Sequence, residues 1–329
     1  MVSRKKIVPP ATVIIPAYNA TRTLRACLDA LQEQSLSPDE IIVVDDGSTD
    51  GTPEMAKSYR SVRVISQENQ GPAKARNKGA RESKNPIIVF LDSDCVPEKN
   101  WLAEMVKPFI DEKVAGVQGA YRTHQKSLVA RFDQADIEFR YEKMKRSSFL
   151  DWIGSYSAAY RKDIFLSHGG FDEHFPRASG EDAEFSYRLS EKGYRLVFNP
   201  AAIVYHSHPD TVERYIHVKH VRAYWRMRMY LKHPRKAVQD SYTPTMLKFN
   251  VAFSLGILFF ALISIPIPDY TFWVRVSALA YVFTFLFSIP HIWRHGIHFV
   301  AIAFGLYFLR SIAFATGMIR GFLDEKVWA

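Results

Sequence analysis

The first 120 residues alternate short β-rich runs with helical patterns. The segment from Thr21 to Gln34, for example, places Leu24, Leu28 and Leu31 on one face of a helix. Strands that alternate with helices are typical of βαβ units, in which helices flank a mostly parallel sheet. The sequence therefore predicts an α/β fold. The expected strands are residues 12–16, 40–44, 62–65, 86–91 and 114–120.

Polar loops follow several of these expected strands. They are Ala17-Tyr18-Asn19, the acidic run from Asp45 to Asp50, the helix start at Gly71, and Asp92-Ser93-Asp94. In an open α/β sheet, ligands bind outside the carboxyl ends of the strands, so we expect these loops to share one edge. The last loop offers two carboxylates directly after an apolar run, which suits a metal and a phosphate. A solvated acidic turn is the alternative.

Two common nucleotide-binding motifs are missing from the sequence. There is no GxGxxG after the first expected strand and no GxxxxGK[ST], so carboxylates, backbone and a metal would have to hold a nucleotide. A nucleotidyltransferase is expected to carry a Gly- and Arg/Lys-rich loop after the first strand, and Ala17-Tyr18-Asn19-Ala20 is not such a loop. Cys27 and Cys95 form no CxxC pattern, which argues against a disulfide framework or a thiolate metal site.

Six ordered motifs run through the first two thirds of the chain. They are Val13-Ile-Ile-Pro-Ala-Tyr-Asn19, Val43-Val-Asp-Asp-Gly-Ser-Thr-Asp50, Gly71-Pro-Ala-Lys-Ala-Arg-Asn77, Phe90-Leu-Asp-Ser-Asp94, Gly169-Gly-Phe-Asp-Glu173 and Gly180-Glu-Asp-Ala-Glu-Phe-Ser-Tyr-Arg-Leu189. Together they resemble the motifs of the family 2 glycosyltransferases with a GT-A fold. The resemblance covers roughly residues 10 to 210. It implies a nucleotide-diphospho-sugar transferase-like sheet flanked by helices.

The resemblance also implies a set of residues that bind a nucleotide-sugar, with a UDP-sugar favoured. Asp45 would contact the nucleobase and ribose, Arg76 would lie near the base or diphosphate, and Asp92 would reach the ribose. A turn acid is the alternative for Asp45 and for Asp46, and a solvated helix residue is the alternative for Arg76. The full expected donor-binding set is Pro16, Ala17, Tyr18, Asp45, Asp46, Arg76, Asp92 and Ser93.

Asp94 is the expected ligand of Mn²⁺ or Mg²⁺ in this resemblance. A leaving nucleoside diphosphate gains negative charge as the glycosidic bond breaks, and a divalent ion on oxygen ligands stabilises that charge. Many relatives carry a histidine near the diphosphate, sometimes as a metal ligand. We expect His206 rather than His208 to take this place, and a histidine satisfied by loop hydrogen bonds is the alternative.

Glu181 and Asp182 are the expected catalytic pair. In the family, the Asp of this pair is the general base that removes a proton from the acceptor hydroxyl, so that attack inverts the anomeric carbon. The pair follows Gly180 at a helix start, where a capping role is the local alternative. Glu184 and Arg188 have the spacing of a structural i, i+4 pair.

The acceptor side is expected at Trp152, Gly170, Phe171, Arg222 and Arg226. Trp152 would stack on a sugar ring, and a place in the core is the alternative. The processive polysaccharide synthases of the family carry Gln-x-x-Arg-Trp, and this chain has His220-Val-Arg-Ala-Tyr-Trp-Arg226 instead. We therefore expect transfer of one sugar. A processive synthase and a catalytically silent nucleotide-sugar binder are the alternatives.

The last third of the chain is strongly apolar. Phe249 to Pro268 carries no charge, and Val276 to Trp293 and His295 to Ile319 follow it, which predicts three membrane spans, with two spans or buried helices as alternatives. Arg310 would snorkel or meet a lipid phosphate. The expected domains are residues 1–210 (catalytic), 211–245 (interfacial), 246–320 (membrane) and 321–329 (tail).

A basic segment precedes the apolar region. Between residues 211 and 245, eight Lys or Arg stand against two acids, within a chain of net charge +9. Such a segment suits an anionic leaflet, and the adjoining apolar region argues against nucleic acid. The N-terminus carries no apolar signal region, so we expect a multi-pass inner-membrane protein whose catalytic domain faces the cytoplasm. The expected acceptor is a polyprenyl phosphate or lipid-linked saccharide, and the oligomeric state is left open.

Overall fold

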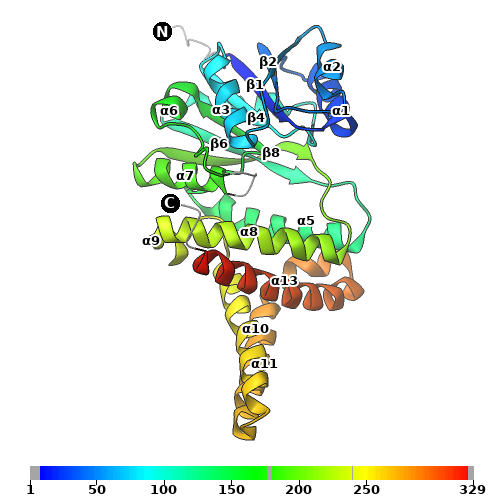
Figure 1. Ribbon diagram of the computed structural model, residues 1–329, viewed down its shortest axis with the longest axis vertical. Coiled ribbons are helices and arrows are strands. Elements are labelled where there is room, and N and C mark those ends of the chain that lie inside the picture. Colours follow the sequence, from blue (N-terminus) through cyan, green and yellow to red (C-terminus); the bar gives the residue numbers. More distant parts are fainter. Residues whose placement is uncertain (1–7, 176–179, 239, 325–329) are drawn as a thin grey trace, which may run out of the picture. The chain divides into compact units, whose positions relative to one another are not determined.

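The computed structural model describes residues 8–175, 180–238 and 240–324, and its chain divides into two compact units. The sheet unit comprises the chain up to His124 together with Met144–Ser207, and the helical unit comprises Gln125–Lys143 and the chain from His208 onward. Figure 1 labels their elements. The segment Gln125–Lys143 lies within the predicted catalytic domain of residues 1–210, and in the structure it groups with the helical unit. The predicted domain boundaries stay a prediction.

The sheet unit is built on one eight-stranded sheet in the order β3-β2-β1-β4-β7-β6-β8-β5. Neighbouring strands are parallel from β3 through β4 and between β6 and β8, and β7 and β5 are antiparallel to their neighbours. The predicted α/β fold with a mostly parallel sheet is thus confirmed. The strands are β1 (Ala11–Ala17), β2 (Glu40–Asp45), β3 (Val62–Ser66), β4 (Ile87–Leu91), β5 (Val96–Pro97), β6 (Val114–Arg122), β7 (Ser157–Arg161) and β8 (Arg195–Tyr205).

Helices cover both faces of this sheet. The first, α1, buries Leu24, Leu28 and Leu31, the face that the sequence predicted. The start of α3 lies at Pro72, directly after Gly71 at φ +92°, a place where proline is pre-organised for a helix. The helices of this unit are α1 (Thr21–Gln32), α2 (Thr52–Lys57), α3 (Pro72–Glu82), α4 (Trp101–Val106), the 3₁₀ turn η1 (Lys107–Ile110), α6 (Lys162–Ser167) and α7 (Glu181–Glu191).

The central strand β4 fixes the site because both of its faces are buried. Every residue from Ile87 to Leu91 is buried, as expected of a strand covered by helices on both sides. Val89 and Leu91 belong to one hydrophobic core, and Phe90 packs on the other face in an aromatic cluster with Phe165 and Phe171. The strand therefore delivers Asp92 and Asp94 to the sheet edge from a rigid base.

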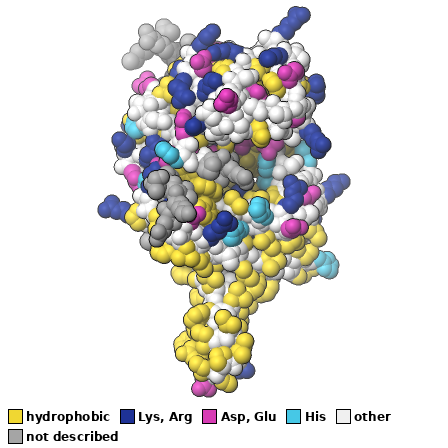
Figure 2. Space-filling model, in the orientation of Figure 1, with side chains coloured by type: hydrophobic (Ala, Val, Ile, Leu, Met, Phe, Trp, Pro, Cys, Tyr) yellow, Lys and Arg dark blue, Asp and Glu magenta, His cyan; other side chains and the backbone are white. Residues whose placement is uncertain are grey.

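The helical unit contains the apolar region of the sequence. Figure 1 shows α10 and α11 as a hairpin, and α13 lying along α8. Figure 2 shows that the hairpin surface is almost entirely hydrophobic. The elements are α5 (Leu128–Arg146), α8 (Val212–Lys232), α9 (Pro234–Val238), α10 (Thr245–Ser264), η2 (Pro268–Tyr270), α11 (Thr271–Leu286), α12 (Ile289–Ile292), η3 (Trp293–His295) and α13 (Ile297–Leu323).

Two helices among the described residues have the length and apolar composition to cross a membrane. They are α10, with 20 residues, and α13, with 27 residues. The predicted span from Val276 to Trp293 is not one helix, because α11 ends at Leu286 and the short elements α12 and η3 follow. Continuous hydropathy does not reveal this break, which falls at Phe287 and Ser288, just before Pro290 in the first turn of α12.

Candidate active site at the carboxyl ends of the strands

The loops at the carboxyl ends of β1, β2 and β4 meet at one pocket, as the parallel order of these strands requires. The pocket has a volume of about 560 Å³ and is called here the strand-end pocket. Seven of the eight predicted donor-binding residues line it, and Asp45 does not. Its lining is Pro16, Ala17, Tyr18, Asp46, Asn69, Gly71, Pro72, Ala75, Arg76, Asp92, Ser93 and Asp94.

Asp45 and Asp46 are both buried at the end of β2. One carboxylate oxygen of Asp46 accepts a hydrogen bond from the Gly71 backbone N–H at 2.9 Å, and the other accepts from the Gln67 side chain at 2.7 Å. Asp46 therefore holds the start of α3 in place. The Asp45 carboxylate accepts from the Ser48 backbone N–H at 3.2 Å. These contacts fit the turn-acid interpretation of both residues.

Arg76 forms a buried bridge between two acidic segments. From α3, its Nη2 donates to Asp92 Oδ1 at 2.6 Å and its Nη1 donates to Glu181 Oε1 at 3.0 Å. Its side chain is 2% exposed. Burial alone would lower the pKa of Arg76, but the two carboxylates outweigh burial and raise it, so the guanidinium stays charged. The solvated-helix alternative for Arg76 is wrong.

The loop after β4 presents its two acids differently. Burial raises the pKa of Asp92, against the opposing effect of Arg76. Asp94 is more open, and its Oδ2 lies 3.3 Å from His206 Nε2. Burial opposes ionisation of Asp94, but hydrogen bonding and attraction to His206 outweigh it and lower the pKa. The Asp94 carboxylate is thus available and ionised at the pocket.

Asp94 and His206 form a pair that suits a divalent cation. No cluster of three or more His, Cys, Asp or Glu side chains with metal-binding geometry occurs within the described ranges. Mn²⁺ and Mg²⁺ accept oxygen ligands, and Mg²⁺ typically takes one or two carboxylates and fills its other positions with water and substrate phosphates. One carboxylate and one imidazole beside an open pocket therefore fit a cation that arrives with a diphosphate.

His208, the other histidine of that motif, has a different environment. It is buried, and its Nε2 lies 2.8 Å from Gln134 Oε1. His206 instead packs its ring on Tyr121, whose own ring stacks on Tyr156. The predicted preference for His206 agrees with these positions, because only His206 faces an acid of the strand-end pocket.

The start of α7 brings the second pair of acids to the same region. Glu181 is buried and accepts from Arg76, while Asp182 is partly exposed and accepts from the Ser155 backbone N–H at 3.0 Å. The next residue, Tyr156, pairs its carbonyl with the Asp92 backbone N–H. Asp182 and the β4 loop are therefore linked through two consecutive residues.

The electrostatics of Asp182 favour a base that titrates near neutrality. Burial and the neighbouring Glu181 raise the pKa of Asp182 to about 6, and hydrogen bonds from Ser155 and attraction to Arg76 limit this rise. A carboxylate with a pKa near the working pH is a more effective base than an ordinary aspartate, because it both exists in the ionised form and holds a proton well.

The predicted acceptor residues Gly170 and Phe171 have packing roles. The ring of Phe171 is buried in the aromatic cluster of β4, and its backbone N–H donates to Asn77 Oδ1 at 2.9 Å. Gly170 adopts φ +65°, and its carbonyl accepts from Arg188 at 2.6 Å. These contacts give both residues a packing role, and their part in acceptor binding stays a prediction.

The other predicted acceptor residues lie in three different settings. Trp152 is partly buried and packs edge-on against Tyr187 in the sheet unit. Arg222 and Arg226 both lie on α8 in the helical unit, where Arg222 is exposed and Arg226 is buried and donates to Thr243 at 3.1 Å. The expected i, i+4 pair between Glu184 and Arg188 is present at 2.9 Å.

Sequence reasoning assigned no role to Asn77 or Ser155. Asn77 ends the motif that begins at Gly71, and its amide both donates to the Phe171 carbonyl and accepts from the Phe171 N–H. Ser155 supplies its backbone N–H to Asp182. The place of Asn77 at the end of a recognised motif was a usable signal, whereas a backbone donor cannot be recognised from side-chain identity.

Comparison with known proteins identifies relatives of the sheet unit. The sequence profile described as "Glycosyl transferase family 2" matches residues 12–167. The O-antigen chain rhamnosyltransferase WbaN of Salmonella anatum is 31% identical over 215 residues, which are 62% of this chain and 68% of that protein. Glycosyltransferase AglE of Haloferax volcanii is 32% identical over 202 residues, 58% of this chain and 64% of AglE. The alignments thus span about two thirds of these relatives.

Solved structures extend the comparison to the fold. A mannosyltransferase from Pyrobaculum calidifontis, solved in complex with GDP-Man and Mn²⁺, superposes with a TM-score of 0.63 at 19% identity and covers 97% of this chain and 89% of its own. GalNAc-T7, solved with UDP, GalNAc and Mn²⁺, superposes with a TM-score of 0.50 at 18% identity over 72% of this chain and 52% of its own. At such identities the likeness concerns the fold alone.

Proposed function

The chain belongs to glycosyltransferase family 2 and has the GT-A fold, and from this membership we propose that it transfers one sugar from a nucleotide-sugar to a lipid acceptor at a membrane. The observation that carries the proposal is the Arg76 bridge. It joins the acids at the end of β4, which suit a donor diphosphate, to the acids at the start of α7, which suit a base.

The strand-end pocket is the proposed donor site. Its volume of about 560 Å³ lies within the ordinary range for small-molecule pockets. The β1 loop from Pro16 to Tyr18 forms one side and the β4 loop forms another, so the base and ribose would lie between them. Asp46 would contribute indirectly, because its hydrogen bond to the Gly71 N–H holds the start of α3 in place. UDP is the nucleotide that we expect, and GDP is the alternative to test.

Asp94 and His206 are the proposed protein ligands of Mn²⁺ or Mg²⁺. When bound, such an ion would neutralise charge that develops on the departing nucleoside diphosphate. His206 is oriented by its contact with Tyr121 and held 3.3 Å from Asp94. Arg76 is not a proposed metal ligand, because its guanidinium is a cation and is paired with Asp92 and Glu181.

Asp182 is the proposed general base. Its carboxylate would take the proton from the acceptor hydroxyl as that oxygen attacks the anomeric carbon, and the nucleoside diphosphate would depart from the opposite face. This displacement inverts the anomeric configuration. The pKa of about 6 supports the role, because most of the carboxylate is then ionised at neutral pH. Glu181 would position Asp182 by tying the start of α7 to Arg76.

The hairpin of α10 and α11 is the proposed membrane anchor. α10 has 20 residues, and a helix of that length spans about 30 Å, close to the thickness of the hydrocarbon core. Apolar side chains on the hairpin are strongly exposed, with Leu262 at 69% and Leu279 at 71%. Trp273 and Tyr270 lie near the hairpin turn, where aromatic residues favour a membrane interface. We therefore propose two crossings, with α10 as one and η2 together with the 16-residue α11 as the other.

α13 is proposed not to cross the membrane, although its composition would allow it. Gly317 of α13 approaches α8 so closely that an added Cβ would lie 2.3 Å from the His220 carbonyl oxygen, and at Gly321 the Tyr224 carbonyl would lie at 2.5 Å. α8 carries many Lys and Arg side chains, which are costly inside hydrocarbon. We therefore propose that α13, which packs along α8, lies with α8 at the membrane surface.

The proposed orientation follows from charge. The basic helices α8 and α9 adjoin one end of the hairpin, and Asp269 lies at its turn. Positive flanks favour the cytoplasmic side. A membrane-impermeant maleimide should label Asp269→Cys from outside intact cells and should label Arg235→Cys only after permeabilisation. External labelling of Arg235→Cys, or protection of Asp269→Cys until permeabilisation, would contradict this topology.

Donor turnover tests the enzymatic proposal. Purified full-length protein in detergent should hydrolyse or transfer from a nucleotide-sugar in the presence of Mn²⁺, and a screen of UDP-, GDP- and dTDP-sugars should identify the donor by a raised melting temperature. Asp182→Asn should bind the same donor and turn it over at least 100-fold more slowly. Equal turnover by both proteins would discredit the base, and binding without turnover in either would favour the silent-binder alternative.

A further inference from the structure

A short segment of the sheet unit contacts both pairs of acids in the proposed active site. It comprises residues 154–156, directly before β7, and is called here the 154–156 segment. Its Ser155 N–H donates to the proposed base Asp182 at 3.0 Å. Its Tyr156 carbonyl accepts from the Asp92 N–H at 3.2 Å. The shape of this segment therefore sets the base relative to the loop after β4.

Stacked rings connect the same segment to the proposed metal ligands. The ring of Tyr156 lies on the ring of Tyr121, with centroids 3.5 Å apart and planes 13° from parallel. The Tyr121 ring lies 4.7 Å from the imidazole of His206, which is 3.3 Å from Asp94. Closely packed rigid groups transmit a displacement, so a movement of Tyr156 would reach His206.

The side chain of Gln118 on β6 holds the 154–156 segment at two points. Its Oε1 accepts from the Gly154 N–H at 3.0 Å, and its Nε2 donates to the Tyr156 hydroxyl at 2.9 Å. The Tyr156 hydroxyl donates onward to the Gly119 carbonyl at 3.2 Å. Because Gln118 is only 1% exposed, water does not compete for these groups. One buried amide therefore fixes both ends of the segment.

The sheet itself does not supply these contacts. The register between β6 and β7 ends at the pair of Gln118 and Ala158, so the buried Gly154 lies beyond it. A buried backbone N–H needs a partner, and the Gln118 amide provides one. Gly154 also has little space, because an added Cβ would lie 2.6 Å from Cε1 of the Tyr156 ring. The ring thus packs against the backbone of its own segment.

We propose that Gln118 is a positioning residue for sugar transfer. It acts through the 154–156 segment, which orients the base Asp182 at one end and the metal ligand His206 at the other. The inference rests on the proposed function, because it assigns Gln118 a role in that same site. Glutamine suits the task because one planar amide offers an acceptor to the backbone and a donor to the hydroxyl.

The base should report a disturbance of the segment through its pKa. Burial raises the pKa of Asp182, and so does the neighbouring Glu181. The hydrogen bond from Ser155 and attraction to Arg76 lower it, and Tyr160 is a further titratable group beside this carboxyl. A loosened segment weakens the Ser155 bond and leaves the Arg76 bridge in place, so the pKa of Asp182 should rise further.

Steady-state turnover by the full-length protein in detergent tests the proposal with two readouts. Gln118→Met has a similar size and removes both hydrogen bonds. It should move the acid limb of kcat/KM upward by at least about 0.5 pH unit and raise the Mn²⁺ concentration for half-maximal turnover at least about 3-fold. Tyr156→Phe keeps the ring and should move both by less. Tyr121→Leu should raise only the Mn²⁺ requirement, because it breaks only the path to His206.

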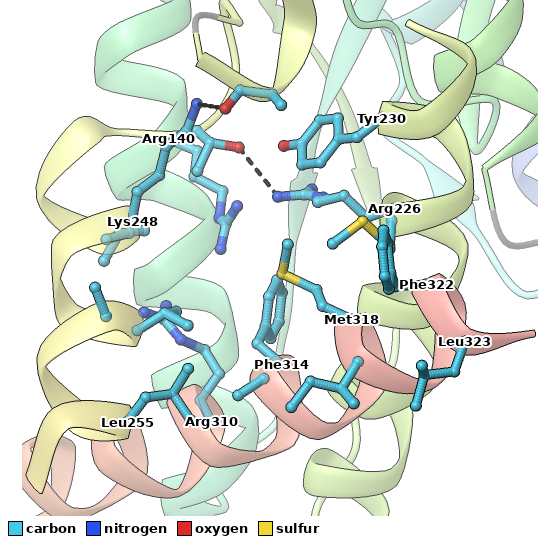
Figure 3. Close-up of a pocket in the computed structure, with 18 residues that line it drawn as sticks. Arg140, Arg226, Tyr230, Lys248, Leu255, Arg310, Phe314, Met318, Phe322 and Leu323 are labelled. Carbon is cyan, nitrogen blue, oxygen red and sulfur yellow. Dashed lines mark hydrogen bonds between the residues drawn. The ribbon is translucent and has the colours of Figure 1, made fainter. Parts of the chain in front are cut away.

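Tyr230 offers a matched control for the change at Tyr156. It lies on α8 of the helical unit, is 9% exposed, and lines a pocket there together with Arg226 and Phe314 (Figure 3). Tyr230→Phe removes a tyrosine hydroxyl, as Tyr156→Phe does, and should leave both the acid limb and the Mn²⁺ requirement unchanged. If Tyr230→Phe moves them as far as Tyr156→Phe does, the effect is not specific to the segment and the proposal fails.

Two measurements without turnover separate this proposal from the proposed function. Because the folded pKa of Asp182 exceeds the ordinary aspartate value, its ionisation lowers stability as the pH rises through that pKa, and Asp182→Asn removes this loss. The gain in melting temperature from Asp182→Asn at pH 7 should therefore be larger in Gln118→Met protein than in otherwise unaltered protein. Mn²⁺ binding with UDP, or with GDP where the donor screen selects it, should also weaken in Gln118→Met, as followed by the EPR signal of free Mn²⁺.

The outcomes of these measurements are distinct. If the unaltered protein turns over its donor and neither Gln118→Met nor Tyr156→Phe moves any readout, the role of Gln118 is overturned and the proposed function stands. A lower kcat with an unchanged acid limb and Mn²⁺ requirement also overturns it, because a merely structural residue has that effect. If Gln118→Met does not fold, Tyr156→Phe decides by the same criteria. If the unaltered protein turns over no donor, the proposed function is contradicted, and the melting and Mn²⁺-binding measurements still decide the role of Gln118.

Discussion

Arg76 and Glu181 lie 105 positions apart in the sequence, and their side chains meet in a buried ion pair at 3.0 Å. The same guanidinium holds Asp92. One arginine on α3 thus sets the position of the β4 loop against the start of α7. Its replacement should therefore disturb both halves of the proposed active site together.

Arg76→Met should destabilise the protein strongly. It leaves Glu181 buried without its cation, and loss of one partner from a buried pair typically lowers stability by about 3–5 kcal/mol. The melting temperature of the full-length protein should fall by at least about 6 °C. Arg63→Met is the matched control, because Arg63 also bridges two acids but is 40% exposed; it should change stability by less than about 1 kcal/mol. Similar losses in both variants would contradict the structural role of Arg76.

The Asp182 carboxylate should set the acid limb of the pH profile. Because the base acts when ionised and its pKa is about 6, kcat/KM should rise with pH through about 6 and level off above it. The profile is measured on the unaltered protein across pH 5 to 8 with saturating Mn²⁺. Asp163→Asn, which removes an exposed acid at the start of α6, should leave the profile unchanged. A flat profile would contradict the assignment.

Asp182 should lower the stability of the fold at neutral pH, where its ionised form is needed for activity. The folded pKa of Asp182 is about 6 and exceeds the ordinary aspartate value of 3.8, so ionisation of this carboxyl lowers the stability of the fold as the pH rises from about 4 to above 6. Asp182→Asn should therefore melt higher than the unaltered protein above pH 6, and the difference should vanish near pH 4. Melting curves at both pH values check this. A variant that melts lower at pH 7 would show that the carboxylate stabilises the fold.

Removal of the metal should abolish turnover. Substitution of either proposed ligand should impair turnover, and substitution of an unrelated acid should not. EDTA should stop the reaction and Mn²⁺ should restore it, while Asp94→Asn should lower turnover at least 100-fold and His206→Ala should raise the Mn²⁺ concentration needed. Asp111→Asn is the control, because Asp111 is as exposed as Asp94 but pairs with Arg195. Turnover that survives both EDTA and Asp94→Asn would refute the metal proposal.

Two adjacent glycines give a sharp test of the turn after α6. Gly170 and Gly169 both have positive φ, but an added Cβ would lie 2.5 Å from Asn77 Oδ1 at Gly170 and would meet nothing within 4 Å at Gly169. Gly169→Ala should therefore lower stability by about 1 kcal/mol, the ordinary penalty of that backbone region. Gly170→Ala should lower it by more, because Asn77 must also move. Equal melting temperatures of the two variants would show that the Asn77 contact is unimportant.

The sequence predicted those features that depend on local pattern, namely the strands, α1 and the acids that follow the strands. The strand ends carried Asp46, Asp92 and Asp94 to one edge because parallel strands order their carboxyl ends alike, and the predicted strands and α1 agree with the structure. The partners of Arg76 were not predictable in this way. In the sequence, the strands β4 to β7 and the helices α4 to α6 lie between Arg76 and Glu181. Only the folded chain brings Glu181 to α3.

The apolar C-terminal region shows what hydropathy alone does not predict. Hydrophobic runs predicted three spans, but hydropathy does not report where a helix ends or which helix it packs on. The middle run breaks at Phe287 and Ser288, before Pro290 in the first turn of α12, and small residues of α13 permit close packing on α8. Phe171 illustrates a related difficulty, since an aromatic side chain can contact a sugar or pack in a core, and the sequence does not show that its ring packs against Phe90.

Packing of α13 along α8 should be directly detectable. His220 Nδ1 and Thr316 Oγ1 lie 3.0 Å apart, so His220→Cys with Thr316→Cys should form a disulfide under mild oxidation, whereas His220→Cys with Gly305→Cys should not. Gly317→Leu should lower the melting temperature by several degrees, because a side chain there meets the His220 carbonyl, and Gly305→Leu, which meets nothing, should not. If α13 instead crossed the membrane apart from α8, the first cysteine pair would stay reduced and both leucine variants would melt alike. The two measurements are independent, since one reports proximity and the other reports packing.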